Sequence, residues 1–408
     1  MISVAEALQL VLENVRPLGP RRMPLEQAFG EILTEPVVSD IDSPPHDKSV
    51  VDGYAVRYAD LADGAAELRI LEEITAGLVP RLAIEQGTTS RVMTGAPVPA
   101  GADSVIMVER STPLASDRVR LDDPKAKRGQ NIVARASVMR RGDVALPAQT
   151  SLTAACVGVA AEAGCTEVTT AARPRAAIVA TGNELVDVGV VPQPSQIRNS
   201  NGPMLAALCR GCRAEPLELG IARDDVDSLR AKIAAGLEAD LLLLSGGVSA
   251  GVLDLVPGVL QELGVREVFH KVSVKPGKPV WFGVWSSPTG ATKPVFGLPG
   301  NPVSTLVCFE LFVKPALAAL RGIAPTGVAA DLPAQLDAPF THRGDRPTYW
   351  PGQFYAPAGN HGPDCVAALP WKGSGDLRTL ARANCLIAFA AGTRDYAAGE
   401  EVRVLPLR

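Results

Sequence analysis

The run Ser245-Gly246-Gly247-Val248-Ser249-Ala250-Gly251 carries the strongest chemical signal in the sequence. It follows the apolar stretch Leu241 to Leu244, which is typical of a buried strand, and it precedes a predicted helix. Glycines let the backbone approach an anion closely, serines offer hydroxyl donors, and a helix start presents unpaired N–H groups. The run therefore predicts a phosphate-binding loop, although a tight turn without a ligand would have the same pattern.

Three lysines, Lys271, Lys275 and Lys278, lie in the run Lys271-Val272-Ser273-Val274-Lys275-Pro276-Gly277-Lys278. Strand alternation would place Val272 and Val274 on one face and the first two lysines on the other. On charge alone they fit a solvated strand end. Because strand ends and helix starts of an open α/β sheet line a common crevice, we expect the lysines to face the glycine-rich loop.

Four carboxylates lie in predicted loops, namely Asp52, Glu184, Asp224 and Asp254. Each has an ordinary explanation, since Asp224 could cap the helix that starts near Val226 and Asp254 could offset a helix dipole. Beside a phosphate loop, however, hard oxygen ligands favour Mg²⁺, which needs only one or two carboxylates in addition to ligand phosphates. The sequence thus predicts a magnesium site.

The run Leu298-Pro299-Gly300-Asn301-Pro302-Val303-Ser304 joins a predicted strand to a helix start through two prolines. A rigid turn of this kind suits a preformed oxyanion site, and it equally suits a well-capped helix with proline at its first position. Both interpretations remain open from the sequence.

Other chemistries lack their motifs. The chain has four histidines and no His-Glu-x-x-His pattern, which argues against zinc hydrolysis, and no Gly-x-Ser-x-Gly nucleophile motif occurs. Cys209 and Cys212 are spaced as C-x-x-C, but no second cysteine pair and no nearby histidine pair completes a zinc site. We interpret them as residues of a helix end.

The composition is that of a globular chain, with 408 residues, 47% hydrophobic and 21% charged residues, and a formal net charge of −4. This balance predicts no general attraction to nucleic acid or to an anionic membrane. The first 15 residues lack the basic region of a secretion signal, and the apolar strings are far shorter than the roughly 20 residues that span a bilayer. Seven scattered cysteines fit reduced thiols. We expect a cytoplasmic protein.

The chain length and the changing pattern predict several domains. From Arg173 onward, apolar strands alternate with amphipathic helices, which favours a doubly wound α/β/α domain. The expected order is a mixed linker domain (1–45 and 136–172), a β-rich insert (46–135), the α/β domain (173–322) and a C-terminal β domain (323–408).

The motifs together resemble one family, the molybdopterin molybdenumtransferases of the MoeA and gephyrin E-domain type, over nearly the whole chain. The matching segments follow one another in the family's order: Val51-Asp52-Gly53-Tyr54-Ala55, Met93-Thr94-Gly95-Ala96-Pro97, Thr181-Gly182-Asn183-Glu184-Leu185, Asn199-Ser200-Asn201, the Ser245 run, Lys275-Pro276-Gly277-Lys278-Pro279, Leu298-Pro299-Gly300-Asn301-Pro302-Val303 and Gly373-Ser374-Gly375.

The resemblance implies a homodimer of four-domain chains, the last domain being a β barrel. It also implies that adenylylated molybdopterin is hydrolysed with Mg²⁺ and that molybdate is inserted into the dithiolene with release of AMP. The reaction would link the chain to a molybdopterin adenylyltransferase and to apo-molybdoenzymes.

Residue by residue, the resemblance implies three groups. Ser245, Gly246, Gly247, Ser249, Lys271, Lys275 and Lys278 would hold phosphate and pterin. Asp52, Glu184, Asp224 and Asp254 would form the catalytic acidic set, with Glu184, Asp224 and Asp254 on the metal. Thr94, Pro299, Pro302 and Arg346 would admit and orient molybdate, and Asp52 and Thr94 could come from the partner subunit.

The sequence departs from the family where Ala136-Ser137-Val138 replaces glycine followed by two acids. The departure leaves three alternatives open. They are a paralogue that prefers tungstate, a molybdopterin-binding scaffold without turnover, and an enzyme that transfers adenylyl groups to molybdopterin.

Overall fold

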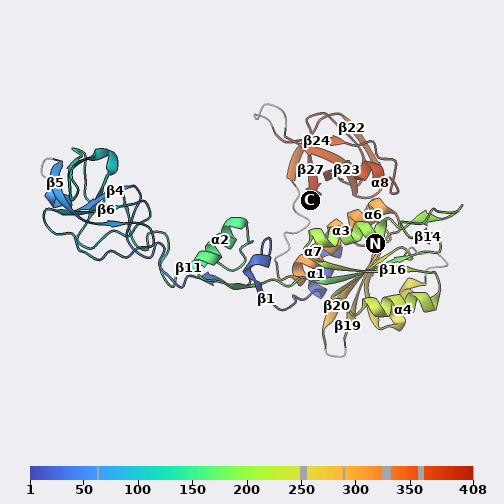
Figure 1. The fold of residues 1–408 in the computed structure, drawn as a ribbon. Helices are drawn as coiled ribbons and strands as arrows, with labels where there is room; N and C mark the ends of the chain where they lie inside the picture. Colours follow the sequence, from blue (N-terminus) through green and yellow to red (C-terminus); the bar gives the residue numbers. More distant parts are fainter. Residues whose placement is uncertain (62–63, 249–254, 288–289, 324–331, 357–362, 408) are drawn as a thin grey trace. The chain divides into compact units, whose positions relative to one another are not determined.

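The computed structural model describes residues 1–61, 64–248, 255–287, 290–323, 332–356 and 363–407. These residues form two compact units, Met1–Arg21 with Ala171–Arg408, and Arg22–Thr170. The first unit holds an α/β domain and a β barrel, and the second holds a six-stranded sheet and a smaller mixed part (Figure 1). The fold class agrees with the sequence prediction.

The α/β domain is built on a six-stranded sheet with the order β16-β13-β17-β20-β19-β18. The first four strands are parallel to one another, and β19 and β18 run antiparallel. Their bounds are β13 Arg175–Thr181, β16 Glu215–Ala222, β17 Leu241–Ser245, β18 Val265–His270, β19 Trp281–Ser286 and β20 Thr292–Leu298.

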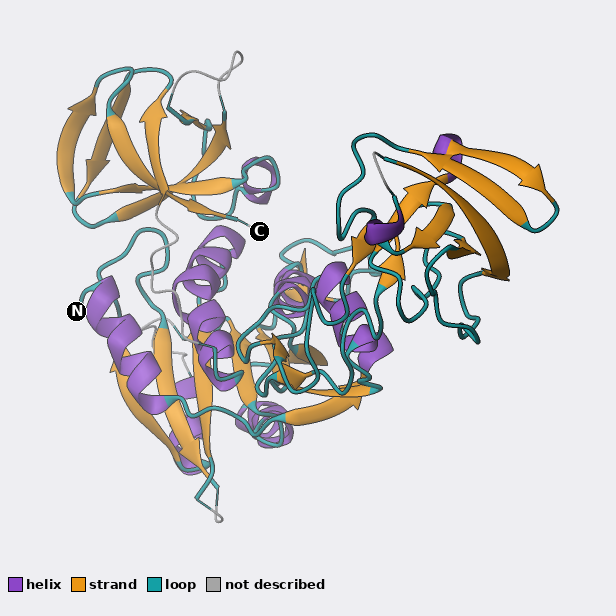
Figure 2. Ribbon diagram, turned by 90° about the vertical axis from the view of Figure 1, so that its left-hand side faces the viewer, coloured by secondary structure: helices purple, strands orange, loops and turns teal. Residues whose placement is uncertain are grey.

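Helices cover both faces of this sheet (Figure 2). Alternation along β13 sends Ala176 and Ile178 into one core and Ala177 and Val179 into the other. The first core is closed by α1 (Val4–Asn14), α3 (Asn201–Gly211), α6 (Pro302–Cys308) and α7 (Lys314–Leu320), the second by α4 (Val226–Gly236) and α5 (Val256–Glu262). The prediction of a doubly wound domain is confirmed.

The strand alternation predicted for Lys271 and Lys275 was wrong. Strand β18 ends at His270, and Lys271 has a left-handed φ of 71°, which an extended strand does not allow. The loop from Lys271 to Val280 is too short for a crossover helix, so β19 returns antiparallel to β18. Val272 and Val274 are nevertheless buried, as the alternation predicted.

Two helical predictions are confirmed in detail. Ser3 accepts a hydrogen bond from the Glu6 N–H, and the Glu6 carboxylate accepts one from the Ser3 N–H, which is the capping box expected at the start of α1. Pro302 opens α6 at its first turn, although the Asn301 side chain makes no capping bond. Among the described residues, one 19-residue helical run, Pro302–Leu320, is long and apolar enough to cross a membrane, and it is 78% buried as a core element.

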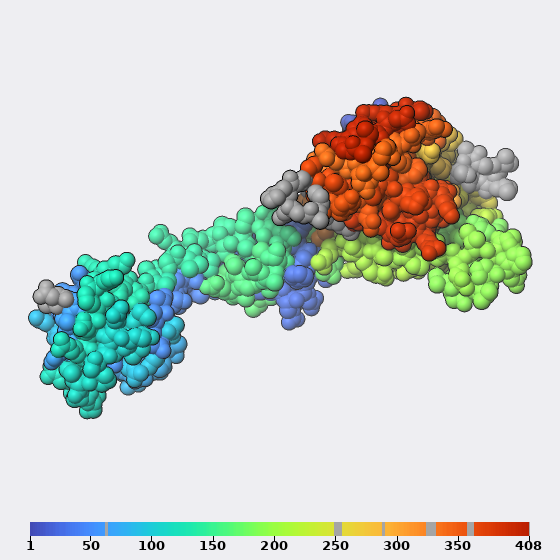
Figure 3. All heavy atoms as spheres, turned by 90° about the horizontal axis from the view of Figure 1, so that it is seen from above, coloured from blue at the N-terminus to red at the C-terminus, as the bar shows by residue number. Residues whose placement is uncertain are grey.

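The C-terminal part is a closed barrel with the order β21-β24-β23-β25-β27, accompanied by a two-stranded antiparallel sheet of β22 and β26. It packs on the α/β domain, since Tyr349, Leu386 and Leu405 belong to the α/β core and Lys275 pairs with Thr348 (Figure 3). The bounds are β21 Leu332–Leu336, β22 Phe340–Gly344, β23 Thr348–Tyr355, β24 Cys365–Ala368, α8 Leu377–Leu380, β25 Cys385–Phe389, β26 Gly392–Tyr396 and β27 Glu401–Pro406.

The second unit contains the β-rich insert, a sheet with the order β7-β4-β6-β5-β9-β8. Beside it lie α2 (Ala154–Glu162), whose start is capped by Thr153, and short two-stranded ladders. The remaining bounds are β1 Arg21–Pro24, β2 Val37–Val38, β3 Lys48–Ser49, β4 Gly53–Val56, β5 Ala65–Ile74, β6 Thr88–Val92, β7 Ser104–Met107, β8 Ser111–Ala115, β9 Arg118–Asp122, β10 Ile132–Val133, β11 Val144–Leu146 and β12 Glu167–Thr170.

Candidate functional site

A cavity of about 750 Å³, here called the sheet-end cavity, lies where β13, β17 and β20 end. Ala180 of β13 pairs with Ser245 of β17, which pairs with Leu298 of β20, so the three parallel strands end side by side. The chain leaves β13 towards α3 on one face and leaves β17 towards α5 on the other. Such a divergence opens a crevice at the carboxyl ends of the strands.

The predicted phosphate loop lines this cavity with Ser245, Gly246 and Gly247. Both glycines have left-handed φ angles, of 98° and 65°. A Cβ on Gly246 would meet the Thr181 carbonyl oxygen at 2.6 Å, and one on Gly247 would meet the Thr181 hydroxyl at 2.8 Å. Glycine is therefore required at both positions for the backbone to face the cavity. Ser249 and Asp254 lie outside the described residues.

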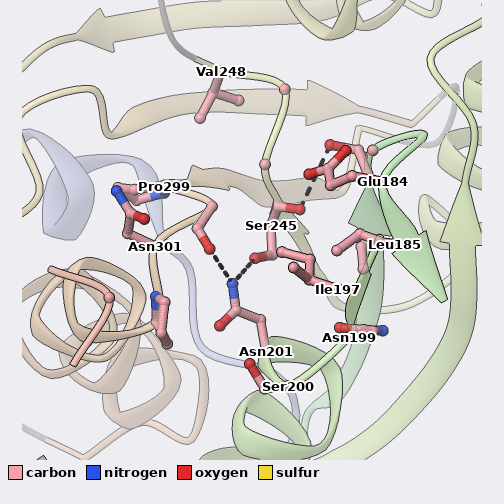
Figure 4. Close-up of a pocket in the computed structure, with 18 of the residues that line it drawn as sticks. Glu184, Leu185, Ile197, Asn199, Ser200, Asn201, Ser245, Val248, Pro299 and Asn301 are labelled. Atoms are coloured by element: carbon pink, nitrogen blue, oxygen red, sulfur yellow. Dashed lines mark hydrogen bonds between the residues drawn. The ribbon is translucent and has the colours of Figure 1, made fainter. Parts of the chain in front are cut away.

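Two of the predicted carboxylates, Glu184 and Asp224, line the same cavity (Figure 4 shows Glu184). Asp224 accepts a hydrogen bond from the Asn183 N–H at 3.1 Å, while the helix α4 is capped by Asp225, so Asp224 is not the cap. Within the described ranges neither carboxylate has a cation in a salt bridge, and no group of three His, Cys, Asp or Glu side chains is placed to hold a metal.

Sequence reasoning missed the role of Asn201, which appeared only within a family motif. Its side-chain amide donates to the Ser245 hydroxyl oxygen at 2.8 Å and to the Gly300 carbonyl oxygen at 2.7 Å (Figure 4). Asn201 is 8% exposed and lines the cavity. A side chain at the start of α3 thus joins the loops that follow β17 and β20, which no local pattern could indicate.

A second cavity of about 490 Å³, here called the basic cavity, lies between the α/β domain and the barrel. Lys275, Lys278, Arg346 and Lys372 line it, so four cations from two domains face one cavity. The remaining lining residues include two tryptophans and two serines, Trp350, Trp371, Ser304 and Ser374. The two cavities are adjacent, because Pro279, Pro299 and Asn301 line both.

Backbone bonds between the two domains fix the position of Lys275. Its N–H donates to the Pro347 carbonyl oxygen at 2.8 Å, and its own carbonyl oxygen accepts from the Tyr349 N–H at 2.8 Å. Arg346 lies on the same barrel segment and forms an ion pair with Asp345 at 3.1 Å. The barrel strand therefore sets the distance between a lysine and an arginine that come from different domains.

His342 belongs to β22 and is buried, and its ring contacts Thr348, two residues after Arg346. Its Nδ1 is 3.0 Å from the Gly392 carbonyl oxygen, and its Nε2 is 2.8 Å from the Thr348 hydroxyl. A carbonyl only accepts, so Nδ1 carries a proton. The Thr348 hydroxyl also lies 3.2 Å from the Arg346 carbonyl oxygen, to which it donates. Burial lowers the pKa of His342 below its ordinary value, the bond to Gly392 opposes this, and nearby Lys275 lowers the pKa further.

Asp52 and Thr94 lie together in the second unit. The Asp52 carboxylate accepts from the Thr94 N–H at 2.7 Å and from the Thr94 hydroxyl at 2.9 Å, and these two bonds lower the pKa of Asp52. Also in this unit, Ala136 has a left-handed φ of 58°, a conformation that favours glycine. The local backbone thus keeps a glycine-like turn at the position where this sequence has alanine.

The predicted residues therefore fall into four groups. Ser245, Gly246, Gly247, Glu184, Asp224, Pro299 and Pro302 line the sheet-end cavity, and Lys275, Lys278, Arg346 and again Pro299 line the basic cavity. Asp52 and Thr94 form a pair in the other unit. Lys271 lines neither cavity.

The C-x-x-C pair takes no part in either cavity. Cys209 is buried in the core and Cys212 ends α3, and both are free thiols. Burial raises the pKa of Cys209 to about 12 and that of Cys212 to about 11. Both thiols stay protonated at neutral pH, which agrees with the interpretation as a helix end.

Three family models match the chain in succession. Residues 2–164 match the MoeA N-terminal region (domain I and II), residues 177–319 a probable molybdopterin binding domain, and residues 333–407 the MoeA C-terminal region (domain IV).

Curated relatives agree with these matches. A molybdopterin molybdenumtransferase of a Nostoc species is 34% identical over 100% of this chain and 94% of its own length. Molybdopterin molybdenumtransferase 2 of Mycobacterium tuberculosis is 34% identical over 100% of both chains. A crystal structure of a molybdopterin biosynthesis MoeA protein from Pyrococcus horikosii has a TM-score of 0.84 and 29% identity, covering 99% of this chain and 98% of that one.

Proposed function

Because the chain belongs to the family of molybdopterin molybdenumtransferases, we propose that adenylylated molybdopterin binds in the sheet-end cavity and molybdate in the basic cavity. The activity of the chain is the transfer of molybdenum to molybdopterin. One observation carries the assignment of the two ligands: two cavities of different charge share the wall made by Pro279, Pro299 and Asn301. Reactants bound on either side of this wall would be neighbours.

The sheet-end cavity has the donors that a pyrophosphate linkage needs. Ser245 offers a hydroxyl, and the glycine backbone at 246 and 247 leaves room for phosphate oxygens at the end of a buried strand. Such donors, fixed before the ligand arrives, stabilise the charge that develops when the linkage is cleaved.

The basic cavity suits a small dianion. Lys275, Lys278, Arg346 and Lys372 bring four positive charges, and Ser304 and Ser374 line the same cavity. Cations and hydroxyls in a partly desolvated cavity bind a tetrahedral oxyanion through short charge-assisted hydrogen bonds. Molybdate is the substrate that this chemistry fits, and tungstate has the same shape and charge.

The donor set of the sheet-end cavity fits Mg²⁺. Glu184 and Asp224 present hard oxygen ligands in one cavity, and within the described part of the chain they have no competing ion pair. These two carboxylates would hold the ion together with phosphate oxygens, with Asp254 as the third proposed ligand. When bound, the ion neutralises charge that develops on the phosphate oxygens. Asp224 is held for this task by the Asn183 N–H.

Further proposals concern the assembly. The Asp52–Thr94 pair would complete the site in a homodimer, with the four-domain division given by the sequence. The protein would act in the cytoplasm between a molybdopterin adenylyltransferase and the apo-molybdoenzymes that receive the finished cofactor. Lys271, with its side chain outside both cavities, would contribute charge only at their margin.

The decisive experiment follows AMP release by chromatography after the purified protein is mixed with adenylylated molybdopterin, MgCl₂ and molybdate. We expect release that needs both the metal and molybdate, with competition by tungstate. If the protein neither binds nor hydrolyses adenylylated molybdopterin, the proposal is overturned. Light scattering on the same sample tests the dimer.

A further inference from the structure

The side chain of Asn201 makes a contact that goes beyond the ligand assignments. Its Nδ2 atom lies between the Ser245 hydroxyl oxygen, at 2.8 Å, and the Gly300 carbonyl oxygen, at 2.7 Å (Figure 4). Ser245 ends the buried strand β17, and Gly300 belongs to the turn after β20. One amide group therefore joins the two loops that form the floor of the sheet-end cavity.

The orientation of this amide is fixed by its partners. The Gly300 carbonyl oxygen can only accept, so the atom facing it must be the nitrogen and not Oδ1. An amide nitrogen has two hydrogens and both are used, one for Gly300 and one for Ser245. The Ser245 oxygen is consequently an acceptor in this contact.

The Ser245 hydroxyl has one proton, and the Asn201 nitrogen does not accept it. Because Asn201 offers only hydrogens to it, this proton must point to another acceptor. Within the described residues the Ser245 hydroxyl donates to no protein acceptor, and Ser245 lines the cavity. The proton is thus available to a ligand atom that accepts hydrogen bonds.

The same side chain is costly as a purely structural element. Its Oδ1 atom is buried and has no hydrogen-bond partner among the described residues. A buried acceptor without a partner destabilises a fold, and a smaller or apolar side chain at the start of α3 would avoid that cost. The two hydrogen bonds that the amide donates therefore offset the cost of its unpaired oxygen.

We propose that Asn201 is a positioning residue that turns the Ser245 hydroxyl proton into the sheet-end cavity, towards an anionic oxygen of the ligand. The inference rests on the proposed function in one respect, namely that this oxygen belongs to a phosphate of adenylylated molybdopterin. Asn201 would touch no reacting atom, and it would act through Ser245 and Gly300.

The variant Asn201→Asp tests the proposal because aspartate has the same shape with the opposite hydrogen-bond character. A carboxylate at 201 accepts the Ser245 proton and so turns it away from the ligand. We expect the Kd for AMP, measured by calorimetry at pH 7.5, and the KM for adenylylated molybdopterin to rise by about tenfold to a hundredfold, the range for losing a hydrogen bond to a charged group. Ser245→Ala should cause a similar loss.

Two signatures separate positioning from a general structural defect. In the Asn201→Asp protein the affinity for AMP should recover relative to wild type as the pH falls towards the pKa of aspartic acid, since the protonated carboxyl donates again. Adding Ser245→Ala to Asn201→Asp should cost little more, because the hydroxyl proton has already been withdrawn. The control is Asn384→Asp, whose amide forms a similar pair of bonds with the Phe354 backbone in the barrel and which should leave AMP binding unchanged.

Wild-type affinity in Asn201→Asp, or losses that simply add in the double variant, would overturn the inference. If wild-type protein neither binds AMP nor releases it, the proposed function fails. The contact of Asn201 with Ser245 is then tested without a ligand. In that case chemical denaturation of the four proteins should show that the Asn201 and Ser245 substitutions are non-additive, and strict additivity would refute the contact.

Discussion

The sheet-end cavity and the basic cavity share a wall but use opposite means to accommodate negative charge. The former, about 750 Å³, offers a serine hydroxyl, glycine backbone, the carboxylates Glu184 and Asp224 and one cation, Arg198, whereas the latter, about 490 Å³, offers four cations. Two anions that must approach each other repel strongly in a shared, partly desolvated space. A wall of two prolines and Asn301 between differently charged cavities would let each anion, bound as proposed, be neutralised separately.

Removing a carboxylate from the sheet-end cavity is the strongest test of the difference in charge between the two cavities. Glu184→Gln keeps the shape but removes a proposed metal ligand and one negative charge. We expect kcat for AMP release to fall by about 10² to 10³-fold, as for the loss of one group that stabilises charge in the transition state. Molybdate affinity should stay within about twofold, since the basic cavity is unchanged.

The exposed Glu238→Gln is the matched control for this substitution. Turnover is measured at saturating adenylylated molybdopterin over a range of MgCl₂ concentrations. Equal kcat in Glu184→Gln and wild type would remove this carboxylate from the proposed metal site.

The converse substitution is Lys275→Met in the basic cavity. Methionine keeps the apolar stem while the ammonium group is lost, so the Kd for molybdate should rise by about tenfold to a hundredfold, the range for a hydrogen bond to a charged group. AMP binding in the sheet-end cavity should change little. Calorimetric titration with molybdate measures the effect, and Lys125→Met, an exposed lysine of the other unit, provides the control.

If Lys275→Met weakens AMP binding and molybdate binding equally, the two cavities are one electrostatic site. The division between them would then be wrong.

The two cavities also differ in how far the sequence predicted them. The sheet-end cavity lies at strand ends of one domain, and the run around Ser245 together with Glu184 and Asp224 pointed to it through local patterns. The basic cavity needs barrel residues that lie far along the chain, such as Trp350, Trp371 and Lys372, and no local pattern relates them to Lys275. Arg346 was reached only through the family resemblance.

Two residues show where local reasoning fails. Lys271 was grouped with the other lysines because strand alternation was extended past His270, where the left-handed conformation of Lys271 ends the strand. Asn201 appeared only within the motif Asn199-Ser200-Asn201, and its proposed use depends on a contact with Gly300, which is 99 residues away. Long-range hydrogen bonds have no sequence period, so they could not be predicted.

Acid should destabilise the barrel segment that carries Arg346, because the His342 ring contacts the Thr348 hydroxyl, which also bonds to the Arg346 carbonyl oxygen. The folded-state pKa of His342 is below its unfolded value, so the unfolded chain binds more protons and stability falls as the pH drops below about 6.5. His342→Gln, which cannot titrate, should lose less stability between pH 7.5 and 5.5.

Thermal unfolding of both proteins across this pH range measures the difference, at about 2 to 4 °C in Tm for each kcal/mol. Parallel pH profiles for wild type and His342→Gln would exclude this histidine as a source of acid lability. Tyr396→Phe, a change on a ring that packs on Phe389, against which His342 also stacks, serves as the control.

The smallest effect is expected at the shared wall, and there the two cavities should respond together. The buried Thr305 hydroxyl lies 2.6 Å from the Pro299 carbonyl oxygen and 3.0 Å from that of Asn301, so Thr305→Val loosens the turn that lines both cavities. We expect a loss of about 1 to 2 kcal/mol in unfolding free energy, as for a buried carbonyl that loses its donor. The affinities for AMP and molybdate should both fall by about two- to fivefold, roughly what a few tenths of a kcal/mol up to 1 kcal/mol produces.

Thr150→Val, which removes a similar bond to the Pro147 carbonyl in the other unit, should affect neither ligand. A change confined to one ligand in Thr305→Val would mean that the wall belongs functionally to that cavity alone.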